Sequence, residues 1–378
     1  MVAFENVRMA IVHDMIVDRG GAERVLLYLH KAFPHADIFT TAYLPQNTYE
    51  EFQEIYIRST WYDKLVFDET YYRKLYFPFG LVAAHRVDLR AYDIVLQSTT
   101  HGAKYARVSK DALVISYCHA PFRLAWNPSS YSQVDRGGIL KKAMYRIVIN
   151  YLRRLDYKAA QRVDVFWTNT KRTAERIHVT YGKEVSKILN PPVDCSRFYV
   201  SNQHQDYFLV VSRLESYKRV ELAIQAFNYL GFKLRIVGRG TQKEFLHSLA
   251  NKNIEFLENI SDQDLAKLYS QCRALIFPQE EDYGITPLEA NASGRPVIAF
   301  GRGGILETMI PFSEENHMAT ALFFQQQSVQ SLIGAVNKFR TISFDPNFIR
   351  KHAEEFDISR FVDRTRSELF DQAQKYFD

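Results

Sequence analysis

The stretch Glu281-Asp-Tyr-Gly-Ile-Thr-Pro-Leu-Glu289 is the part of the sequence that best indicates the fold. It lies between the apolar run Ala274–Phe277 and the segment Gly294–Ala299. This order of segments is typical of a strand, a loop that leads into a helix, and a second strand. In a parallel sheet such a loop leaves the carboxyl end of a strand, which is where open α/β folds bind their ligands.

Two glutamates flank this loop, with seven residues between them. Pro287 suits the first turn of a helix, because the N–H group that proline lacks would have no partner there. The pattern therefore predicts Glu289 in the first helical turn and Glu281 in the preceding loop. Two carboxylates in this place are suited to hold the hydroxyl groups of a sugar. Acids are also common in loops, and the helix dipole alone favours a glutamate near a helix start, so the spacing leaves both interpretations open.

Short apolar runs alternate with helical patterns along the chain, which predicts parallel sheets with crossover helices. The first series of predicted strands is Met9–Val12, Ile94–Leu96, Leu113–Ser116 and Val163–Trp167, with a first helix over Gly21–Phe33. The second series is Phe208–Val211, Lys233–Val237, Ile254–Phe256, Ala274–Phe277 and Pro296–Ala299. The prolines of Asn190-Pro-Pro-Val-Asp194 interrupt regular structure between the two series. We therefore expect two doubly wound α/β domains, 1–195 and 196–357, followed by a closing helix over 358–378.

Composition is consistent with a globular protein of two domains. The chain has 378 residues, of which 47% are hydrophobic and 24% charged. It has no run of 18 apolar residues and no recognisable secretory signal at its start, so we expect a cytoplasmic protein. Cys118, Cys195 and Cys272 lack metal-ligand spacing and are predicted to be buried thiols. A net charge of +5 is too small to indicate a nucleic-acid partner.

The longer segment from Phe277 to Ala299 resembles the signature of retaining glycosyltransferases of family 4, whose two glutamates have the same separation. The resemblance extends from Gly20 to Glu307. It implies the GT-B fold, in which two Rossmann-like domains face each other across a cleft. By this resemblance the amino-terminal domain would bind the acceptor, the carboxyl-terminal domain would bind the nucleotide sugar, and the final helix would cross back to the first domain.

Glycine-containing loops are the predicted phosphate and nucleotide contacts. Gly20 and Gly21 follow the first predicted strand and open a helix, where backbone N–H groups favour an anion, although a tight turn needs the same residues. Gly238 and Gly240 fit either a backbone approach to the nucleotide or a plain turn between strand and helix. The loop Gly301–Glu307 is similar, and the resemblance places it beside the donor.

Arg213 and Lys218 are the predicted cations of the donor site. They follow a predicted strand and lie a few residues apart. Taken alone, such a pair is usually a surface charge, but it matches the arginine and lysine that hold the diphosphate in the family. A charge-assisted hydrogen bond contributes roughly 1.5–3 kcal/mol, so two such groups would hold a diphosphate firmly.

The resemblance gives the two glutamates separate roles. Glu281 would hold sugar hydroxyls and steady the developing positive charge, and Glu289 would hold the ribose diol. The loop residues between them that would contact the nucleotide sugar are Tyr283, Gly284, Ile285 and Thr286. Tyr283 stands where phenylalanine is usual and follows an Asp rather than a Gly, and Asn190-Pro-Pro replaces an Asn-Gly turn. We expect no metal ion, since no carboxylate triad stands out, and no cofactor, because the nucleotide sugar is a substrate.

His119 follows a predicted strand within Tyr117-Cys-His-Ala-Pro-Phe-Arg-Leu-Ala-Trp126. A lone histidine is more often structural. This run nevertheless resembles the histidine loop of bacterial mannosyl- and glucosyltransferases of family 4, in which the histidine approaches a sugar hydroxyl and the acceptor. We therefore predict a catalytic role for His119. His13 and Asp14 are weaker candidates beside it.

These features predict a retaining, metal-independent transferase that moves glucose or mannose from a UDP or GDP donor to a saccharide or lipid-linked acceptor. The resemblance implies a same-face mechanism in which the leaving phosphate takes the acceptor's proton. Three alternatives are a non-catalytic nucleotide-sugar-binding subunit of a glycan-assembly complex, a two-lobed binding protein without chemistry, and a sugar-nucleotide epimerase or dehydrogenase. The last normally carries a Gly-x-Gly-x-x-Gly loop, which Gly20-Gly21 does not fit.

Two segments mix apolar and basic residues. Leu140–Leu155 has apolar residues at helical spacing, with Lys142, Arg146, Arg153 and Arg154 among them, and Tyr71–Leu81 combines aromatic residues with cations. Such helices usually have one core side and one solvated side. The other interpretation is a peripheral contact with an anionic membrane, on the inner face of the plasma membrane, which would suit a lipid-linked acceptor.

Overall fold

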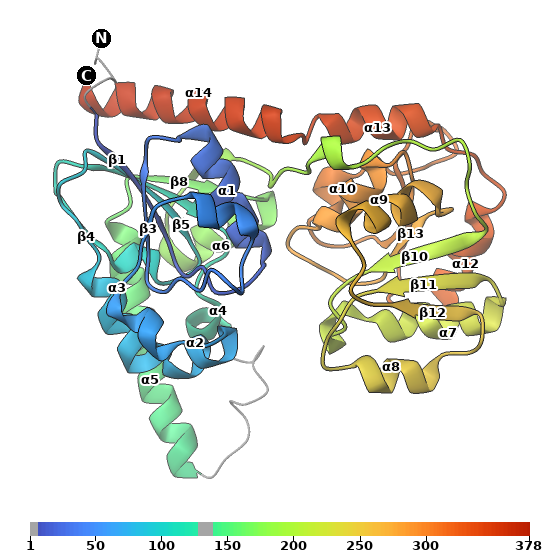
Figure 1. Cartoon of the computed structure of the whole chain (residues 1–378), viewed down its shortest axis with the longest axis horizontal. Coiled ribbons are helices and arrows are strands. Elements are labelled where there is room, and N and C mark those ends of the chain that lie inside the picture. The colour runs from blue at the N-terminus through green and yellow to red at the C-terminus, as the bar shows by residue number, and fades with distance from the viewer. Residues whose placement is uncertain (1–6, 128–138) are drawn as a thin grey trace. The chain divides into compact units, whose positions relative to one another are not determined.

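The computed structural model describes residues 7–127 and 139–378, which form two compact units (Figure 1). The first unit comprises the described residues up to Asn190 together with Phe361–Asp378. The second unit is Pro191–Arg360. The chain therefore passes from one unit to the other at the two prolines, and it returns near the start of its last helix.

The first unit is built on a seven-stranded sheet of order β3-β2-β1-β5-β7-β8-β9, in which every pair is parallel. The strands are β1 (Met9–His13), β2 (Asp37–Thr40), β3 (Ile57–Arg58), β5 (Ile94–Thr99), β7 (Leu113–Cys118), β8 (Val165–Thr168) and β9 (Val185–Ile188). All residues of β5 and β7 are buried, because helices cover both faces of a parallel sheet. A short parallel pair, β4 (Asp88–Leu89) and β6 (Arg107–Val108), lies apart from this sheet.

The first unit also contains helices, most of which connect its strands. They are α1 (Gly21–Ala32), α2 (Glu69–Leu75), the π-helical turn η4 (Tyr76–Gly80), α3 (Leu81–Arg86), α4 (Arg123–Trp126), α5 (Ile139–Gln161), α6 (Lys171–Tyr181) and α14 (Ile358–Phe377). The last helix packs on this unit through Phe361, whose ring contacts Tyr28 and Tyr117. The Arg366 guanidinium also donates to the carbonyl oxygen of Ala32, at 2.7 Å.

The second unit has a six-stranded sheet of order β12-β11-β10-β13-β14-β15, again with parallel pairs. The strands are β10 (Tyr207–Val211), β11 (Lys233–Val237), β12 (Ile254–Leu257), β13 (Leu275–Phe277), β14 (Val297–Phe300) and β15 (Ala321–Phe324). The helices are α7 (Val220–Leu230), α8 (Lys243–Leu249), α9 (Asp262–Gln271), α10 (Ile285–Ala292), α11 (Ile305–Thr308), α12 (Val329–Phe339) and α13 (Pro346–Glu354). Phe208 and Val210 belong to one apolar cluster, whereas Tyr207 and Leu209 belong to another, so alternate residues fill the cores on opposite faces.

The predicted α/β class and parallel sheets are confirmed, and each predicted strand is present with its ends within three residues of the predicted ones. The structure adds β2, β3, β4, β6, β9 and β15, which were not predicted from the sequence. All three cysteines are buried free thiols, as predicted.

A buried ion pair fixes the long helix α5 to the rest of the first unit. The Lys104 ammonium lies 2.7 Å from a carboxylate oxygen of Asp156 on α5, and neither side chain is exposed. The Tyr181 hydroxyl and the Trp126 indole N–H donate to the second carboxylate oxygen, at 2.7 and 2.8 Å. Both charges are therefore paired and hydrogen-bonded, which is the condition under which a buried charge is tolerated.

We predict that Asp156→Asn lowers the free energy of unfolding by about 3–5 kcal/mol, because it leaves the Lys104 charge buried without its partner. Asp88→Asn is the matched control, since Asp88 pairs with Arg90 at an exposed site. We expect the control to change the stability by about 1 kcal/mol or less. Urea denaturation followed by circular dichroism measures both values, and equal effects would contradict the assignment.

Candidate functional site

The candidate donor site lies in the loops at the carboxyl ends of the strands of the second unit. These loops are joined through their backbones. After β10 and β11, the N–H of Ser212 donates to the carbonyl oxygen of Val237 at 3.0 Å, and the N–H of Leu214 donates to the carbonyl oxygen of Arg239 at 2.7 Å. After β13 and β14, the N–H of Gly304 donates to the carbonyl oxygen of Glu281 at 2.8 Å. The predicted site residues therefore lie on two pairs of loops, and backbone hydrogen bonds join the two loops of each pair.

The predicted glycines Gly238 and Gly240 lie where these loops touch. A Cβ atom on Gly238 would lie 1.8 Å from the carbonyl oxygen of Ser212, and one on Gly240 would lie 2.3 Å from that of Leu214. Gly303 is equally restricted, because its Cβ would lie 2.3 Å from the carbonyl oxygen of Glu281. Contact between loops alone is thus sufficient reason for glycine at these positions.

Lys218 and Glu281 meet in this loop cluster, although they are 63 positions apart in the sequence. Lys218 ends a single 3₁₀ turn (Ser216–Lys218) after β10, and its ammonium forms an ion pair with Glu281 Oε1. The Gln279 side-chain amide donates to the same oxygen at 3.0 Å. The two charged side chains are only 12% and 21% exposed, so water screens their interaction weakly.

Glu289 lies on α10 and is partly buried. The Tyr269 hydroxyl, which comes from α9, donates to Glu289 Oε2 at 2.7 Å. Tyr269 is fully buried, and burial raises the pKa of its hydroxyl well above the usual value, so it stays a donor. The prediction that Glu289 lies in the first helical turn is wrong, because α10 begins at Ile285 and Glu289 is its fifth residue. Pro287 is tolerated as the third residue, since the N–H groups at the first positions of a helix have no helical partner.

The remaining residues that were predicted to contact the donor lie in the loops after β10 and β13 and at the start of α10. Arg213 is exposed, and its guanidinium donates to the Tyr217 hydroxyl at 3.0 Å. The Tyr283 hydroxyl donates to the carbonyl oxygen of Pro191 at 2.7 Å, which ties the loop to the start of the unit. Gly284 is the N-cap of α10, and Ile285 and Thr286 are its first two residues, both partly exposed.

Gly20 and Gly21 open α1 at the carboxyl end of β1, as the sequence predicts. The carboxyl group of Glu23 lies against Gly20, because a Cβ there would be 2.2 Å from Glu23 Oε2. Burial, with the nearby charges of Asp18, Glu69 and Asp14, raises the pKa of Glu23 to about 8. Near neutral pH, the acid beside the Gly20-Gly21 turn is therefore largely uncharged.

His119 follows β7 at the carboxyl edge of the first sheet and is partly exposed. Its Nε2 lies 2.9 Å from the Ser98 hydroxyl on β5, and that hydroxyl lies 2.9 Å from Nδ1 of His13 at the end of β1. Ser98 was not predicted from the sequence to belong to the site. The only indication in the sequence is that Ser98 is a polar residue near the end of the apolar strand Ile94–Thr99.

Asp14 organises the loop that follows β5. Its carboxylate accepts hydrogen bonds from the Thr99 hydroxyl at 2.6 Å and from the backbone N–H groups of Thr100 and Ala103 at 2.6 and 2.8 Å. Burial alone would raise the pKa of Asp14, but the charge and hydrogen bond of His101 and the Thr99 hydroxyl hold it well below its usual value. Asp14 is thus an ionised anchor for this loop.

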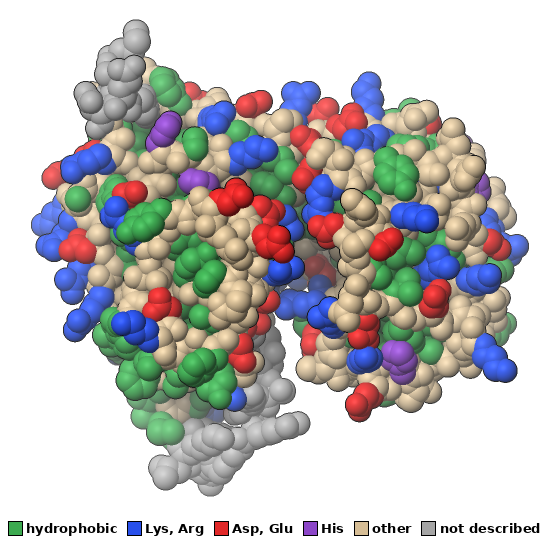
Figure 2. All heavy atoms as spheres, in the orientation of Figure 1, with side chains coloured by type: hydrophobic (Ala, Val, Ile, Leu, Met, Phe, Trp, Pro, Cys, Tyr) green, Lys and Arg blue, Asp and Glu red, His purple; other side chains and the backbone are tan. Residues whose placement is uncertain are grey.

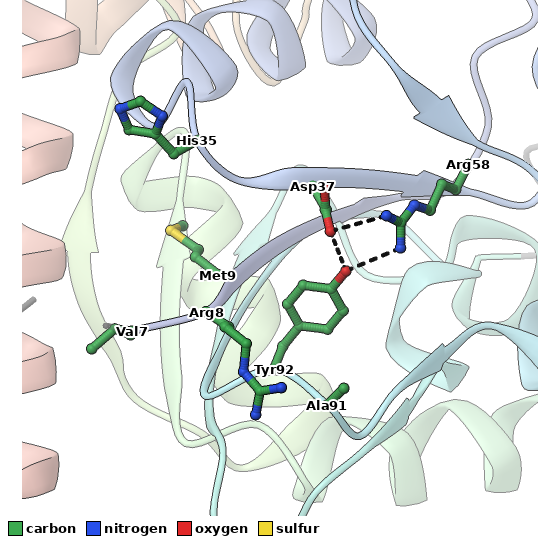
Figure 3. Close-up of a pocket in the computed structure, with 8 residues that line it drawn as sticks. All are labelled: Val7, Arg8, Met9, His35, Asp37, Arg58, Ala91 and Tyr92. Atoms are coloured by element: carbon green, nitrogen blue, oxygen red, sulfur yellow. Dashed lines mark hydrogen bonds and ion pairs between the residues drawn. The ribbon is translucent and has the colours of Figure 1, made fainter. Parts of the chain in front are cut away.

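A pocket of about 380 Å³ lies at the opposite edge of the first sheet, where β1 and β2 begin (Figure 3). Two of its charged side chains, Asp37 and Arg58, are paired with each other. The Arg58 guanidinium lies 3.4 Å from the carboxylate of Asp37, and the Tyr92 hydroxyl donates to that carboxylate. None of the predicted site residues lines this pocket.

Two features are absent from the described residues, 7–127 and 139–378. Within these ranges, no group of three or more His, Cys, Asp or Glu side chains is arranged to hold a metal ion. Nor does this part of the chain contain a helix that is both long and apolar enough to cross a membrane.

Comparison with protein families agrees with the resemblance in the sequence. Residues 19–197 match the model for Glycosyltransferase Family 4, and residues 196–355 match the model for Glycosyl transferases group 1. The two matches together cover both units. The chain belongs to the family 4 type of glycosyltransferases with the GT-B fold.

Similar curated proteins include an alpha-1,3/1,6-mannosyltransferase of Saccharomyces cerevisiae, which is 27% identical over 294 residues. This match covers 63% of the chain and 56% of the yeast protein, so the chain spans little more than half of that relative. A D-rhamnosyltransferase of Pseudomonas aeruginosa is 25% identical over 248 residues, covering 59% of the chain and 64% of the relative.

Solved structures with the same fold include sucrose-phosphate synthase from Thermosynechococcus elongatus, with a TM-score of 0.72 and 14% identity. That match covers 97% of the chain and 99% of the synthase. The Anabaena protein HepE in complex with UDP has a TM-score of 0.70 and 14% identity, covering 97% of the chain and 100% of HepE. At this identity the likeness establishes the fold alone.

We predict that Gly238→Ala lowers the free energy of unfolding by about 1–3 kcal/mol, because the added methyl group displaces the loop that contains Ser212. Gly334→Ala is the matched control, since Gly334 lies within α12 and a Cβ there meets nothing within 4 Å. We expect the control to gain about 0.5–1 kcal/mol, because alanine favours a helix over glycine. Chemical denaturation measures both, and a Gly238→Ala protein as stable as the parent would refute the close loop contact.

Proposed function

We propose that the chain is a retaining, metal-independent hexosyltransferase that moves glucose or mannose from a UDP or GDP donor to a saccharide or lipid-linked acceptor. The observation that carries this proposal is the convergence of Lys218 and Glu281 at the carboxyl ends of β10 and β13. The similarity to a mannosyltransferase and a D-rhamnosyltransferase supports hexosyl transfer. Structures of HepE with UDP and with UDP-glucose support a nucleotide diphosphate sugar as the donor.

Lys218 and Arg213 would bind the diphosphate. When the bond between the sugar and the diphosphate breaks, negative charge grows on the leaving oxygen, and a cation fixed in advance stabilises that charge most effectively. Lys218 is fixed in this sense by its ion pair with Glu281. Arg213 is exposed and bonded to Tyr217, so it would reach the phosphates by a change of rotamer.

Glu289 would bind the ribose of the nucleotide. An ionised carboxylate can accept hydrogen bonds from both hydroxyls of a diol. The hydroxyl of Tyr269 donates to one oxygen of this carboxylate and so helps to fix its orientation.

The surroundings of Glu281 support a mechanism without a covalent glycosyl-enzyme intermediate. Lys218 and Gln279 both bind Glu281 Oε1, and a carboxylate held in this way is a weaker nucleophile than one without partners. In the proposed reaction the bond from the anomeric carbon to the diphosphate breaks, and the acceptor oxygen attacks the same face. The acceptor's proton passes to the leaving phosphate oxygen, while Glu281 holds sugar hydroxyls.

We predict that Lys218→Ala and Glu289→Ala each weaken donor binding by about 10- to 150-fold, the loss of one charge-assisted hydrogen bond of roughly 1.5–3 kcal/mol. His119→Ala should reduce turnover more than donor affinity. The matched control is Lys243→Ala, which removes an exposed lysine that pairs with Glu258 in the same unit. A thermal-shift panel of nucleotide sugars identifies the donor, and titration calorimetry then compares the variants.

Transfer at the parental rate by all three site variants would remove the site assignment. Donor binding without transfer to any acceptor would instead indicate a non-catalytic nucleotide-sugar-binding subunit.

A peripheral membrane contact of the first unit is part of this proposal. Met144, Ile147 and Tyr151 lie on one face of α5 and are 63%, 71% and 52% exposed. The ring of Phe77 contacts that of Tyr151, with centroids 6.4 Å apart, and so links this face to the exposed Phe79 of η4. Figure 2 shows hydrophobic side chains gathered over the region of α2 and α3. Monomeric proteins rarely expose large contiguous apolar surfaces without a partner.

Basic side chains accompany this surface, which we define as the α5 ridge: Met144, Ile147, Tyr151, Phe77 and Phe79. Arg146, Arg154 and Lys158 are exposed on α5, whereas Asp156 of the same helix is buried and paired. Apolar side chains beside cations are typical of surfaces that bind anionic membranes. Leu140 and Lys142, which the sequence also indicated, have side chains outside the described set.

We predict that liposomes with anionic lipid sediment the protein at low salt better than neutral liposomes do. Replacing both Met144 and Ile147 with serine should remove this difference. Val179→Ser is the matched control, because Val179 is 84% exposed on α6 of the same unit and lies outside the α5 ridge. Equal sedimentation by both kinds of liposome would rule out the contact.

A further inference from the structure

Three side chains from neighbouring strands form one hydrogen-bonded chain in the first unit. His13 ends β1 and is paired in register with Ser98 of β5, and His119 follows β7, the next strand of the sheet. The Ser98 hydroxyl lies 2.9 Å from Nδ1 of His13 and 2.9 Å from Nε2 of His119. Ser98 is fully buried and His13 is 2% exposed, so water can hardly replace these contacts.

The number of protons restricts this chain. A serine hydroxyl has one hydrogen, which it can donate to only one of the two ring nitrogens. The other nitrogen must then carry a hydrogen of its own and donate to the serine oxygen. Two bare nitrogens would leave one of the two contacts without a hydrogen. Two N–H groups could both donate to the serine oxygen, which has two lone pairs, but the buried hydroxyl hydrogen of Ser98 would then lose both of these acceptors.

Both rings are neutral at ordinary pH. Burial lowers the pKa of His13 to about 4, against the opposing charge of Asp14. Burial and the neighbouring His13 lower the pKa of His119 to about 3. The titratable groups near these three side chains are Asp14 and His101, together with Tyr117, whose ring contacts that of His119. A neutral imidazole carries its single proton on either Nδ1 or Nε2.

We infer that Ser98 couples the tautomers of His13 and His119, so that both rings carry their proton on the nitrogen of the same name. If His119 is protonated on Nε2, it donates to Ser98, and Ser98 donates to Nδ1 of His13, which leaves the His13 proton on Nε2. If Ser98 instead donates to Nε2 of His119, the proton of that ring is on Nδ1. Nδ1 of His13 must then donate to Ser98. Of the two mixed combinations, one leaves a contact without a hydrogen and the other leaves the buried Ser98 hydroxyl hydrogen without either ring nitrogen as an acceptor.

This coupling makes Ser98 and His13 positioning residues for His119, an assignment that depends on the proposed function. The nitrogen of His119 that faces away from Ser98 then changes between donor and acceptor only when the tautomer of His13 changes as well. The hydrogen bond that His119 offers to a sugar or acceptor hydroxyl is therefore set together with the proton position of His13. In many catalytic sites a hydrogen bond to one ring nitrogen fixes the tautomer of the imidazole in this way.

The first test is nitrogen-15 NMR of the histidine rings in the intact protein at neutral pH. We expect both His13 and His119 to be protonated on Nδ1, or both on Nε2. In Ser98→Ala this agreement should be lost and at least one ring should populate both tautomers, whereas Ser98→Thr, which keeps the hydroxyl, should restore it. The matched control is Ser116→Ala, because Ser116 is also fully buried and its hydroxyl has no partner within the described residues.

The second test is kinetic. We expect Ser98→Ala to lower kcat about 10- to 100-fold with little change in the KM for the donor, and Ser98→Thr to recover most of the loss. A purely structural role would predict no such separation of kcat from KM. Rings protonated on differently named nitrogens, or a Ser98→Ala protein with parental tautomers and kcat, would overturn the inference. The NMR test needs no turnover, so a chain that proves inactive with every donor contradicts the proposed function and still decides the coupling.

Discussion

Close backbone contact between loops is the constraint on which the candidate donor site depends. The strands of the second unit are parallel, so their carboxyl ends lie along one edge, and the loops that leave them must share that space. Glycine at Gly238, Gly240 and Gly303 allows carbonyl oxygens of the neighbouring loops to come closer than any side chain would permit. Lys218 and Glu281 stand directly on these joined loops. The backbone therefore places the charged groups, and their own hydrogen bonds complete the arrangement.

The two units stabilise their functional edges by different means. In the first unit buried charges fix the loops and helices. Asp14 holds the loop after β5 through backbone N–H groups, and the pair of Lys104 and Asp156 fixes α5. The second unit uses close-packed glycine loops instead. A buried charge fixes its hydrogen-bond partners in direction, whereas backbone packing fixes a loop without any charge.

Much of the fold could be predicted from the sequence, because strands buried on both faces appear as short apolar runs. The missed strands differ for physical reasons. β9 lies at the edge of its sheet and carries the exposed residues Ser186 and Lys187, and β2 includes Asp37 and Thr40, so neither has a continuous apolar pattern. The run Ala321–Phe324, which forms β15, is apolar throughout, so it could have been predicted as a strand but was not. Ser98 and Tyr269 could not be assigned to the site, because each contacts residues that lie far away in the sequence, and spacing carries no information about such pairs.

The ion pair of Lys218 with Glu281 gives the proposed reaction a simple balance of charge. Within the chain the ammonium and the carboxylate neutralise each other at a weakly exposed position. A lysine ammonium has three N–H groups, so Lys218 could donate to the phosphate oxygens of a donor and keep its bond with Glu281. Lys218 and Gln279 both bind Glu281 Oε1, so Oε2 would be the oxygen that accepts from sugar hydroxyls. Since each charge would keep a partner, neither would be left buried and unpaired during binding, which is the state that costs most free energy.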